Sequence, residues 1–429
     1  MSKFITEPER QIPVETETDV LVAGAGPAGT AAAISAARQG AKTVLIEQSG
    51  DVGGQATAGL MSDWSYGSSG GIYEEILNRS SDSAEPARRR TINPEKLKTA
   101  LSDMLYEAGV ILKLYTFASG VIMDGNTVKG VITESKAGRK AILAKTVIDA
   151  TGDGDIAAKA GAEFVKGRQG DGKMQPMSLI FKVAGVDTQR AVFPRGFESN
   201  IEIPGGGIQD LGRKHLAFPL GHVLLYPTTL PGVVTCNMTN AVGMDGTNPD
   251  DLTASSRLCR KQTDEIVSFL RKVVPGFESC YVISSASQLG VRETRHFAGE
   301  YTLTEEDIAA ARVFDDWVVT RAYFNFDIHN VDGPGLDKHG EQKHFKQRNG
   351  YTIPYRCLLP VKIDNLLLSG RNISGTHKAH SNFRVMPICA KVGQAAGIAA
   401  ALAARKNIRP RDVLAAEIQE IQRQNGVEV

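Results

Sequence analysis

The pattern of apolar and polar residues near the start of the chain predicts a strand–helix–strand unit. Residues 20–23 and 43–46 are short, continuous apolar runs of the kind that form buried strands. Between them lies an alanine-rich segment of helical character, which ends at Gly40, a residue type that commonly terminates helices. The two runs and the intervening segment therefore predict a βαβ unit.

A glycine fingerprint stands at the first turn of this unit. Gly24, Gly26 and Gly29 follow the first strand directly, and Glu47 ends the second strand. Gly24 allows the tight turn, Gly26 lets the backbone approach a pyrophosphate, and Gly29 lets helix and strand pack closely. The helix N-terminus offers unpaired N–H groups to the phosphates, and the Glu47 carboxylate is placed to accept hydrogen bonds from both ribose hydroxyls. The order of these features predicts dinucleotide binding rather than a purely structural unit.

The pattern changes twice along the rest of the chain, near residue 161 and again near residue 365. The predicted strands are 110–114, 121–123, 128–133, 144–148, 177–183, 222–226, 233–237 and 365–368, and the predicted helices include 252–274 and 390–404. This order predicts an α/β fold in two domains. A Rossmann-like nucleotide-binding domain comprises residues 1–165 and 355–429, and a mixed α+β substrate domain, residues 166–354, is inserted between its two parts.

Composition and charge exclude some classes of partner. The 429 residues exceed one average domain of about 150 residues, and 42% hydrophobic and 23% charged residues are typical of a soluble globular protein. Lys and Arg total 49 against 48 acidic residues, so no overall field favours nucleic acid or an anionic membrane. We therefore expect neither a nucleic-acid partner nor a membrane partner.

The N-terminal residues and the cysteines predict a cytoplasmic location. Residues 1–18 are polar and lack the apolar core of a signal peptide. The apolar window 20–37 is about as long as a membrane span, but the nucleotide-binding fold explains its glycines, proline and alanines. The five cysteines lie far apart without a Cys-x-x-Cys pair, which fits reduced thiols and argues against a metal cluster or a redox-active disulfide. We therefore expect a cytoplasmic protein.

Further motifs extend this pattern over nearly the whole chain. They are Gly53-Gly54, Asp149-Ala150-Thr151-Gly152, Gly290-Val291-Arg292-Glu293-Thr294-Arg295, Ser369-Gly370-Arg371 with Ser374 and His377, and Arg384-Val385-Met386-Pro387 with Gly393-Gln394-Ala395-Ala396-Gly397. Together with the glycine fingerprint, the sequence resembles the FAD-dependent oxidoreductase family of the glutathione-reductase-like FAD superfamily. That family is also related to fumarate-reductase-type and thiazole-synthase-type flavoproteins.

The resemblance implies an FAD-binding domain of the glutathione-reductase type and an extended FAD. Adenosine would lie at Glu47, the pyrophosphate at residues 24–29 and the isoalloxazine near the C-terminal motif. Relatives that attach flavin covalently use a His or Cys near the glycine pair, and residues 53–58 contain neither, so we expect non-covalent FAD. The residues expected to bind the cofactor are Gly24, Gly26, Pro27, Ala28, Gly29, Glu47, Gln48, Gly53, Gly54, Gln55, Ala150, Thr151, Gly152, Asp155, Gly370, Arg371, Met386 and Gly393.

Histidines are the candidates for proton transfer where the two domains meet. His377 follows the last strand of the flavin domain, and His380 is a weaker candidate beside it. His296 and His329 are weaker still. No cluster of His, Asp and Glu has convincing metal spacing, so we expect no metal site.

Arginines are the candidates for holding a substrate. Arg384, Arg292 and Arg295 have the forked guanidinium groups that bind a carboxylate or carbonyl oxygen. Interdomain salt bridges with Glu293 or Asp327 would explain the same residues equally well. With His377, these three arginines form the predicted catalytic set.

These observations predict an enzyme that transfers a hydride between flavin N5 and a small anionic or carbonyl-bearing substrate. Three other functions remain open: an NAD-dependent dehydrogenase, a tRNA-modifying flavoprotein and a non-catalytic flavin-binding protein. No dedicated nicotinamide domain is expected, because glycines 205–207 follow no clear strand and open no helix. The electron acceptor or donor is unknown, and the chain is compatible with a homo-oligomer.

Overall fold

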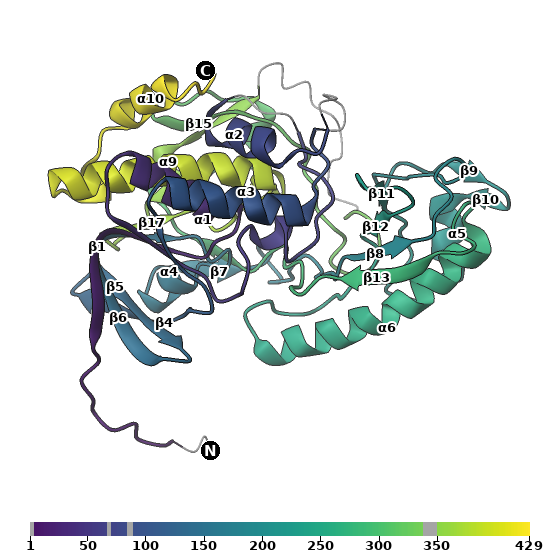
Figure 1. Cartoon of the computed structure of the whole chain (residues 1–429), viewed down its shortest axis with the longest axis horizontal. Coiled ribbons are helices and arrows are strands. Elements are labelled where there is room, and N and C mark those ends of the chain that lie inside the picture. The colour runs from purple at the N-terminus through teal and green to yellow at the C-terminus, as the bar shows by residue number, and fades with distance from the viewer. Residues whose placement is uncertain (1–3, 67–69, 84–88, 338–349) are drawn as a thin grey trace.

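The chain folds into a larger and a smaller part (Figure 1). The computed structural model describes residues 4–66, 70–83, 89–337 and 350–429. The larger part is built on a seven-stranded sheet, and the smaller part, built mainly from residues 181–285, lies at the other end of the long axis. The predicted α/β class, with a Rossmann-like domain and a mixed second part, is confirmed.

The large sheet has parallel strands at its centre. Its strands are β1 (Val14–Ala23), β2 (Thr43–Ile46), β3 (Ile111–Lys113), β4 (Phe117–Asp124), β5 (Thr127–Ser135), β6 (Gly138–Asp149) and β17 (Leu366–Leu368). They lie in the order β3-β2-β1-β6-β5-β4, and β17 also pairs with β6. The pairs β1–β2, β2–β3, β1–β6 and β6–β17 are parallel, whereas β4, β5 and β6 form an antiparallel meander.

β6 belongs to both halves of this sheet. Residues 138–143 pair with β5, and the end of the strand pairs with β1 on one side and β17 on the other. Ala23 and Leu368 are both in register with Asp149. Strand ends from three distant parts of the chain therefore meet at Asp149.

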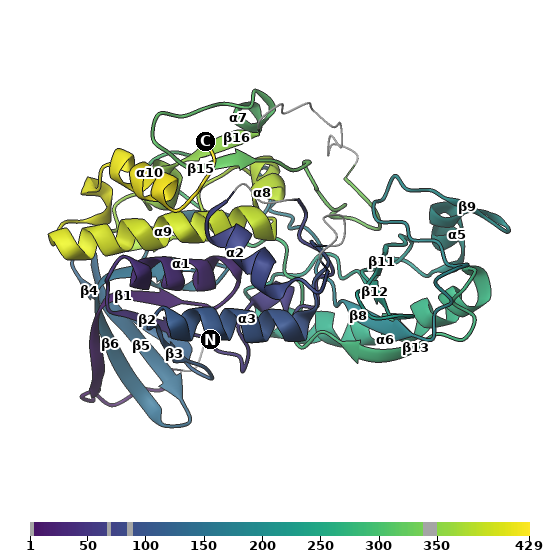
Figure 2. The same cartoon turned by 45° about the horizontal axis from the view of Figure 1, so that its top comes forward.

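Two apolar helices, α1 (Pro27–Arg38) and α9 (Met386–Lys406), lie side by side against the sheet (Figure 2). A Cβ atom at Gly393 would lie 2.1 Å from the Ala28 carbonyl oxygen, and one at Gly397 would lie 2.2 Å from the Ala32 carbonyl oxygen. The small residues of α9 therefore allow its close approach to the backbone of α1.

Within the described residues, α9 is long and apolar enough to cross a membrane by length and composition alone. However, 94% of its most apolar window is buried inside the protein. This burial is what a core helix requires, because α9 packs on α1, β1 and β6. The cytoplasmic location stays a prediction.

Other helices and short strands complete the larger part. They are α2 (Gly71–Ser80), α3 (Pro94–Glu107), α4 (Asp155–Lys159), α7 (Glu305–Ala309), α8 (His377–Phe383) and α10 (Ala415–Gln424), with the strand pairs β7 (Phe164–Lys166)–β14 (Arg295–Phe297) and β15 (Trp317–Ala322)–β16 (Tyr351–Pro354). The apolar core around the large sheet includes Phe297, Leu303 and Tyr351, from the segment that the sequence assigns to the inserted domain. The domain boundaries at 165 and 354 stay a prediction.

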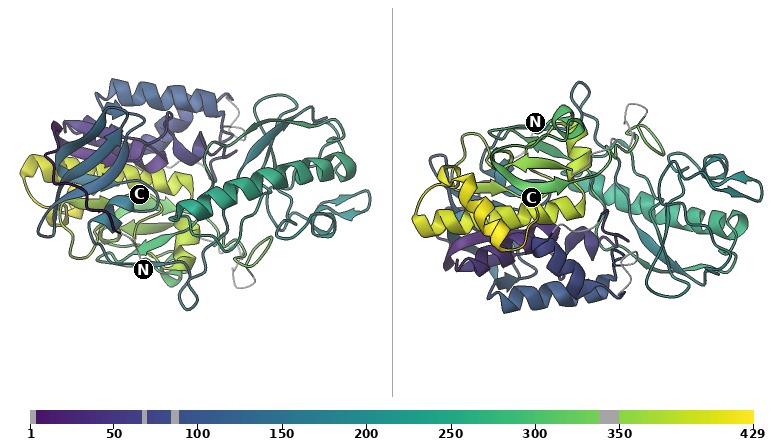
Figure 3. Two further views of the ribbon diagram at one scale, coloured as in Figure 1. Left: turned by 90° about the horizontal axis from the view of Figure 1, so that it is seen from below. Right: turned by 90° about the horizontal axis from the view of Figure 1, so that it is seen from above.

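The smaller part has its own sheet and its own core. Its elements are β8 (Phe181–Ala184), β9 (Glu202–Ile203), β10 (Gly206–Gly207), α5 (Ile208–His215), β11 (Leu225–Pro227), β12 (Val234–Cys236), α6 (Pro249–Val273) and β13 (Tyr281–Ser285). The sheet order is β11-β12-β8-β13, and Phe181, Ile266 and Phe277 belong to a separate apolar cluster. Figure 3 shows α6 reaching along the smaller part toward the larger one.

The structure corrects one expectation about glycines 205–207. Gly206 and Gly207 form β10, which pairs with β9, and α5 begins directly afterwards at Ile208. The expectation that this run follows no strand and opens no helix was wrong, because two-residue strands carry no readable apolar pattern. The two strands are antiparallel, so the context still differs from a βαβ fingerprint.

Replacing Gly397 with Ala should destabilise the protein. Ala has the higher helix propensity by about 1 kcal/mol, but its Cβ would meet the Ala32 carbonyl oxygen, which no side-chain rotation can move. We expect the free energy of unfolding, measured by urea denaturation, to fall by about 2 kcal/mol. The exposed Arg405→Ala in the last turn of α9 is the control and should change it by less than about 0.5 kcal/mol. A neutral Gly397→Ala would contradict the packing described here.

Candidate functional site

A cavity of about 1370 Å³ lies at the carboxyl ends of β1, β2, β6 and β17. Residues of α6 and of the segments around β8, β11 and β13 close it from the smaller part. Most of the predicted cofactor-binding residues line this cavity: Gly24, Gly26, Pro27, Ala28, Glu47, Gln48, Gly54, Gln55, Ala150, Thr151, Gly152, Asp155, Gly370, Arg371 and Met386. The carboxyl edge of a parallel sheet is the usual place for a nucleotide in such folds.

The N-terminus of α1 faces this cavity without a side-chain cap. Gly26 is its N-cap residue and Pro27 its first residue, so backbone N–H groups of the first turn are free to bind an anion. A Cβ atom at Gly26 would meet nothing within 4 Å, whereas one at Gly29 would lie 1.7 Å from the Gly24 carbonyl oxygen. Gly26 thus leaves open space at the helix end, and Gly29 permits the tight turn.

Glu47 is held at the end of β2 by backbone groups. Its Oε2 accepts a hydrogen bond from the Ala25 N–H at 2.7 Å, and its Oε1 accepts one from the Ser49 N–H at 2.7 Å. The side chain is buried but still lines the cavity. Each carboxylate oxygen keeps acceptor capacity, so these bonds fix the orientation in which Glu47 would meet ribose hydroxyls.

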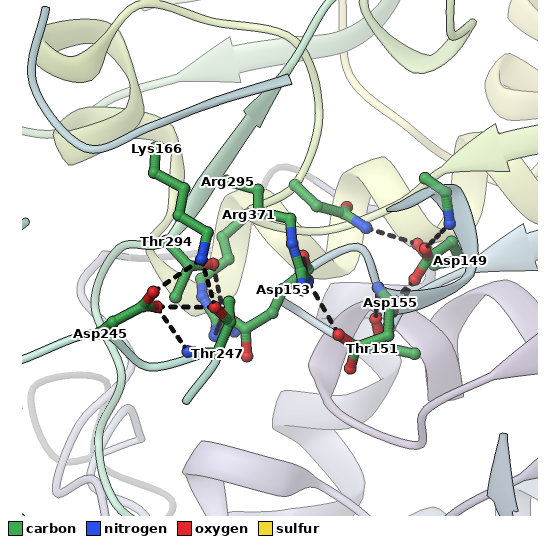
Figure 4. Close-up of polar contacts among 12 residues, drawn as sticks. Asp149, Thr151, Asp153, Asp155, Lys166, Asp245, Thr247, Thr294, Arg295 and Arg371 are labelled. Carbon is green, nitrogen blue, oxygen red and sulfur yellow. Dashed lines mark hydrogen bonds and ion pairs between the residues drawn. The ribbon is translucent and has the colours of Figure 1, made fainter. Parts of the chain in front are cut away.

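Asp149 organises the loop that follows β6 (Figure 4). Its Oδ1 accepts hydrogen bonds from the Thr151 N–H and hydroxyl at 3.1 and 2.7 Å, and its Oδ2 accepts one from the Ala157 N–H at 2.8 Å. Burial raises the pKa of Asp149 to about 6, against the lowering effect of these bonds. The fully buried side chain therefore shapes the cavity wall without lining it.

Asp153 joins three distant segments of the chain beside this loop (Figure 4). Its Oδ1 accepts hydrogen bonds from Arg371 Nη2 at 2.6 Å and from the Thr294 hydroxyl at 2.7 Å. Arg295 Nη1 donates to the Asp153 carbonyl oxygen at 2.8 Å and to Asp155 Oδ1 at 2.9 Å. Arg295 therefore forms a salt bridge, as the alternative interpretation expects, but its partner is Asp155 rather than Glu293 or Asp327.

Several predicted site residues lie outside the cavity lining. Gly53 has a positive φ of 97° and donates its N–H to the Ala25 carbonyl oxygen at 2.7 Å. Gly29 and Gly393 serve backbone packing. The histidine His377 and the arginine Arg295 are also absent from the lining. Their roles in cofactor binding or catalysis stay predictions.

His377 belongs to a buried polar cluster behind the cavity. Glu293 Oε1 accepts hydrogen bonds from His377 Nδ1 and, at 2.7 Å, from His296 Nε2, while Oε2 accepts one from the Gln175 N–H at 2.9 Å. Burial raises the pKa of Glu293, but the bonds from the two histidines outweigh it and hold the pKa below its usual range. Burial also lowers the pKa of His380 well below its ordinary value.

The same cluster brings possible metal ligands together. Ligand atoms of Glu293, His296 and His380 lie within 4.8 Å of one another. The sequence spacing does not reveal this group, because His380 reaches it from α8, far along the chain. Glu293 Oε1 is already bonded to two histidines, and the expectation of no metal stays a prediction.

Arg292 and Arg384 do line the cavity, and they meet Asp327 and His329 there. Arg384 Nη2 lies 3.0 Å from Asp327 Oδ2, and His329 Nε2 lies 3.5 Å from the same oxygen. Burial, followed by the charge of Arg384, lowers the pKa of Arg292 to about 10. Burial raises the pKa of Asp327, but His329, Arg384 and Arg292 outweigh it and hold the pKa below its usual range.

Sequence reasoning gave little weight to His329 and missed Asn237. Both line the cavity, and both are more than nine-tenths buried. The Asp-x-His spacing of residues 327–329 was an available signal for the first. No local signal marks Asn237, which comes from the segment after β12.

The chain is similar to several known proteins. The sequence model of the family described as "FAD dependent oxidoreductase" matches residues 19–423. The tRNA uridine 5-carboxymethylaminomethyl modification enzymes MnmG of Dichelobacter nodosus and Geobacter sulfurreducens are each 31% identical, over 36% and 33% of this chain. These matches span only 27% and 25% of the length of those relatives. A geranylgeranyl bacteriochlorophyll reductase-like structure from Thermoplasma acidophilum is 15% identical, with a TM-score of 0.49, covering 95% of this chain and 84% of that one.

Gly26→Ala and Gly29→Ala should have opposite effects on stability and cofactor binding. The Gly26→Ala side chain would enter open cavity, so we expect thermal stability of the cofactor-free protein to be unchanged and FAD affinity to fall at least tenfold. Gly29→Ala would collide with the Gly24 carbonyl and should lower the free energy of unfolding by about 2 kcal/mol or more. Fluorescence titration with FAD and thermal melts measure both effects. Equal FAD affinity in Gly26→Ala and the wild type would contradict the assignment.

Proposed function

The chain belongs to the FAD-dependent oxidoreductase family, and we propose that it transfers a hydride between a small anionic or carbonyl-bearing substrate and N5 of bound FAD. The chain is an enzyme whose cofactor is FAD. The observation that carries the finer proposal is the pair of partly buried arginines, Arg292 and Arg384, in the wall of the cavity that the expected nucleotide-binding residues also line.

The residues of the cavity fit FAD. The open space at Gly26 and the uncapped first turn of α1 suit a pyrophosphate, and Glu47 is oriented at the end of β2 for ribose hydroxyls. Residues 53–58 contain no His or Cys, which supports non-covalent binding. When bound, FAD supplies a two-electron acceptor or donor for a hydride.

The charges of the cavity wall support an anionic substrate. Arg384 is paired with Asp327, whereas the hydrogen bond of Arg292 goes to the Pro176 carbonyl oxygen, at 2.7 Å. Among the residues that the structure describes, no carboxylate forms an ion pair with Arg292. Its partly buried charge therefore supports binding of one substrate carboxylate or polarised carbonyl, an interaction that would be strengthened where the bound substrate excludes water.

Modification of tRNA is a second candidate function, because the two MnmG relatives share the matched segment with this chain. The exposed α6 side chains Arg257, Arg260 and Lys261 line the outer end of the cavity and would supply phosphate contacts. Micromolar or tighter binding of unmodified tRNA at physiological salt, weakened in Arg257→Gln, would favour this candidate. Membership of the FAD-dependent oxidoreductase family argues against the other two functions, an NAD-dependent dehydrogenase and a non-catalytic binding protein.

Arg292→Gln should slow reduction of the flavin while leaving FAD in place. The variant removes a partly buried positive charge from the cavity wall, and Arg292 donates its hydrogen bond to the Pro176 carbonyl oxygen rather than to a fingerprint residue. We expect the rate of anaerobic flavin bleaching by a reducing substrate to fall by ~10²-fold or more. Stopped-flow absorbance measures this rate, and the flavin-to-protein ratio measures cofactor content.

Arg213→Gln is the matched control, because this exposed arginine lies on α5 of the smaller part and does not line the cavity. It should bleach at the wild-type rate. Wild-type bleaching by Arg292→Gln would show that Arg292 does not bind the substrate. Loss of FAD from that variant would instead assign Arg292 to cofactor binding.

A further inference from the structure

One wall of the cavity carries a buried histidine in contact with a carboxylate. His329 Nε2 lies 3.5 Å from Asp327 Oδ2, and the His329 backbone N–H donates to Gln175 Oε1 at 3.1 Å. The edge of the Phe197 ring packs against the imidazole, with ring centroids 5.0 Å apart. These contacts fix the ring in one place while it still lines the cavity.

The environment keeps His329 neutral. Burial, followed by the charge of Arg292, lowers the pKa of His329 to about 4, and Asp327 only partly opposes this. Arg384, from the end of α8, acts in the same direction as Arg292. His222, whose ring also contacts Phe197, is itself kept neutral because burial lowers its pKa to about 3. The contact of Nε2 with the Asp327 carboxylate assigns the proton to Nε2 and leaves Nδ1 as an acceptor.

Two further groups of the same wall are available to a ligand. Within the described residues, the hydrogen bond of Arg292 goes to a backbone carbonyl oxygen. Asn237 is 8% exposed, and its side-chain amide oxygen has no hydrogen-bond partner among the described residues. Both residues line the cavity with His329. A guanidinium suits a carboxylate, and a neutral imidazole with an amide acceptor suits hydroxyl donors.

We infer that the substrate is a hydroxy acid oxidised at its alcohol carbon, with His329 as the base, Asp327 as its positioning residue and Arg292 as the carboxylate site. The inference rests on the proposed function and adds the substrate class, the direction and the base. The alcohol carbon loses its hydrogen with the bonding electron pair to FAD, and the hydroxyl loses its proton to Nδ1 of His329. A carbon–oxygen double bond forms, so the substrate is oxidised by two electrons and FAD is reduced by two.

Two variants of His329 separate its role as a base from its hydrogen bond to the hydroxyl. His329→Gln keeps a hydrogen-bonding side chain but has no basic nitrogen, whereas His329→Phe loses both. The probes are lactate, glycerate and gluconate, each compared with propionate, which has no hydroxyl, and with glycerol, which has no carboxylate. Calorimetry measures binding, and anaerobic stopped-flow absorbance measures flavin bleaching.

We expect at least one of the three hydroxy acids to bleach the wild-type flavin, and propionate and glycerol to leave it oxidised. His329→Gln should bind that acid within about threefold of the wild type but bleach at least ~10²-fold more slowly. His329→Phe should also lose the preference for the hydroxy acid over propionate, by about fivefold in affinity. The exposed His215→Gln on α5 is the control and should match the wild type in both measurements.

The pH profile gives a further check. Because the base works only when unprotonated, the bleaching rate should be independent of pH from about 6 to 8 and should fall tenfold per unit below about pH 4. Asp327→Asn removes the carboxylate that raises the pKa of His329, so the fall in rate should begin at a lower pH than in the wild type. Between pH 6 and 8 the rate should be lower than in the wild type, because the imidazole ring is no longer held by the carboxylate.

Each failure has a distinct meaning. Bleaching by other anionic or carbonyl compounds but by no hydroxy acid would overturn this inference and leave the proposed function standing. A wild-type bleaching rate in His329→Gln would overturn the assignment of His329 as the base. If no anionic or carbonyl compound bleaches the flavin, the proposed function itself fails.

Discussion

The buried carboxylate of Asp149 is the interaction on which the site depends. It stands where β1, β6 and β17 end side by side, and it receives three hydrogen bonds from the loop and helix that follow β6. Its own carbonyl oxygen accepts bonds from the Ser369 N–H and from Asn372 Nδ2, both at 2.9 Å. Segments from the start, the middle and the end of the chain are therefore fixed at one edge of the sheet. Without this junction the fingerprint and the C-terminal motif would have no common cavity.

The cavity then acquires two chemically different ends. At the sheet, open space and the N–H groups of α1 suit a nucleotide, while the wall facing the smaller part carries Arg292, Arg384, Asp327 and His329. Two partly buried arginines against one partly buried carboxylate leave a positive charge in the cavity wall. This surplus, rather than the overall charge of the chain, is the basis of the proposal that the substrate is anionic.

Histidines show how tertiary contacts assign roles that residue type leaves open. His377 has the position in sequence that proton transfer requires, yet Glu293 binds it in a buried cluster with His296. His329, from a loop with no strand or helix of its own, lies in the cavity wall beside a carboxylate. The two histidines differ because the fold leaves the side chain of His329, and not that of His377, in the lining of the cavity.

The sequence by itself determined the βαβ unit, the glycine fingerprint, Glu47 and the return of the chain to the same domain, because these depend on local periodicity and on backbone space at particular glycines. The small residues at 393, 396 and 397 allowed a close approach to either a backbone or a cofactor, and only the structure shows that α9 lies against the backbone of α1. Only the tertiary structure decided that Arg292 and Arg384 face the cavity while Arg295 pairs with Asp153 and Asp155. Residues of one motif point in different directions, and only the packing of the folded chain determines which of them lines the cavity.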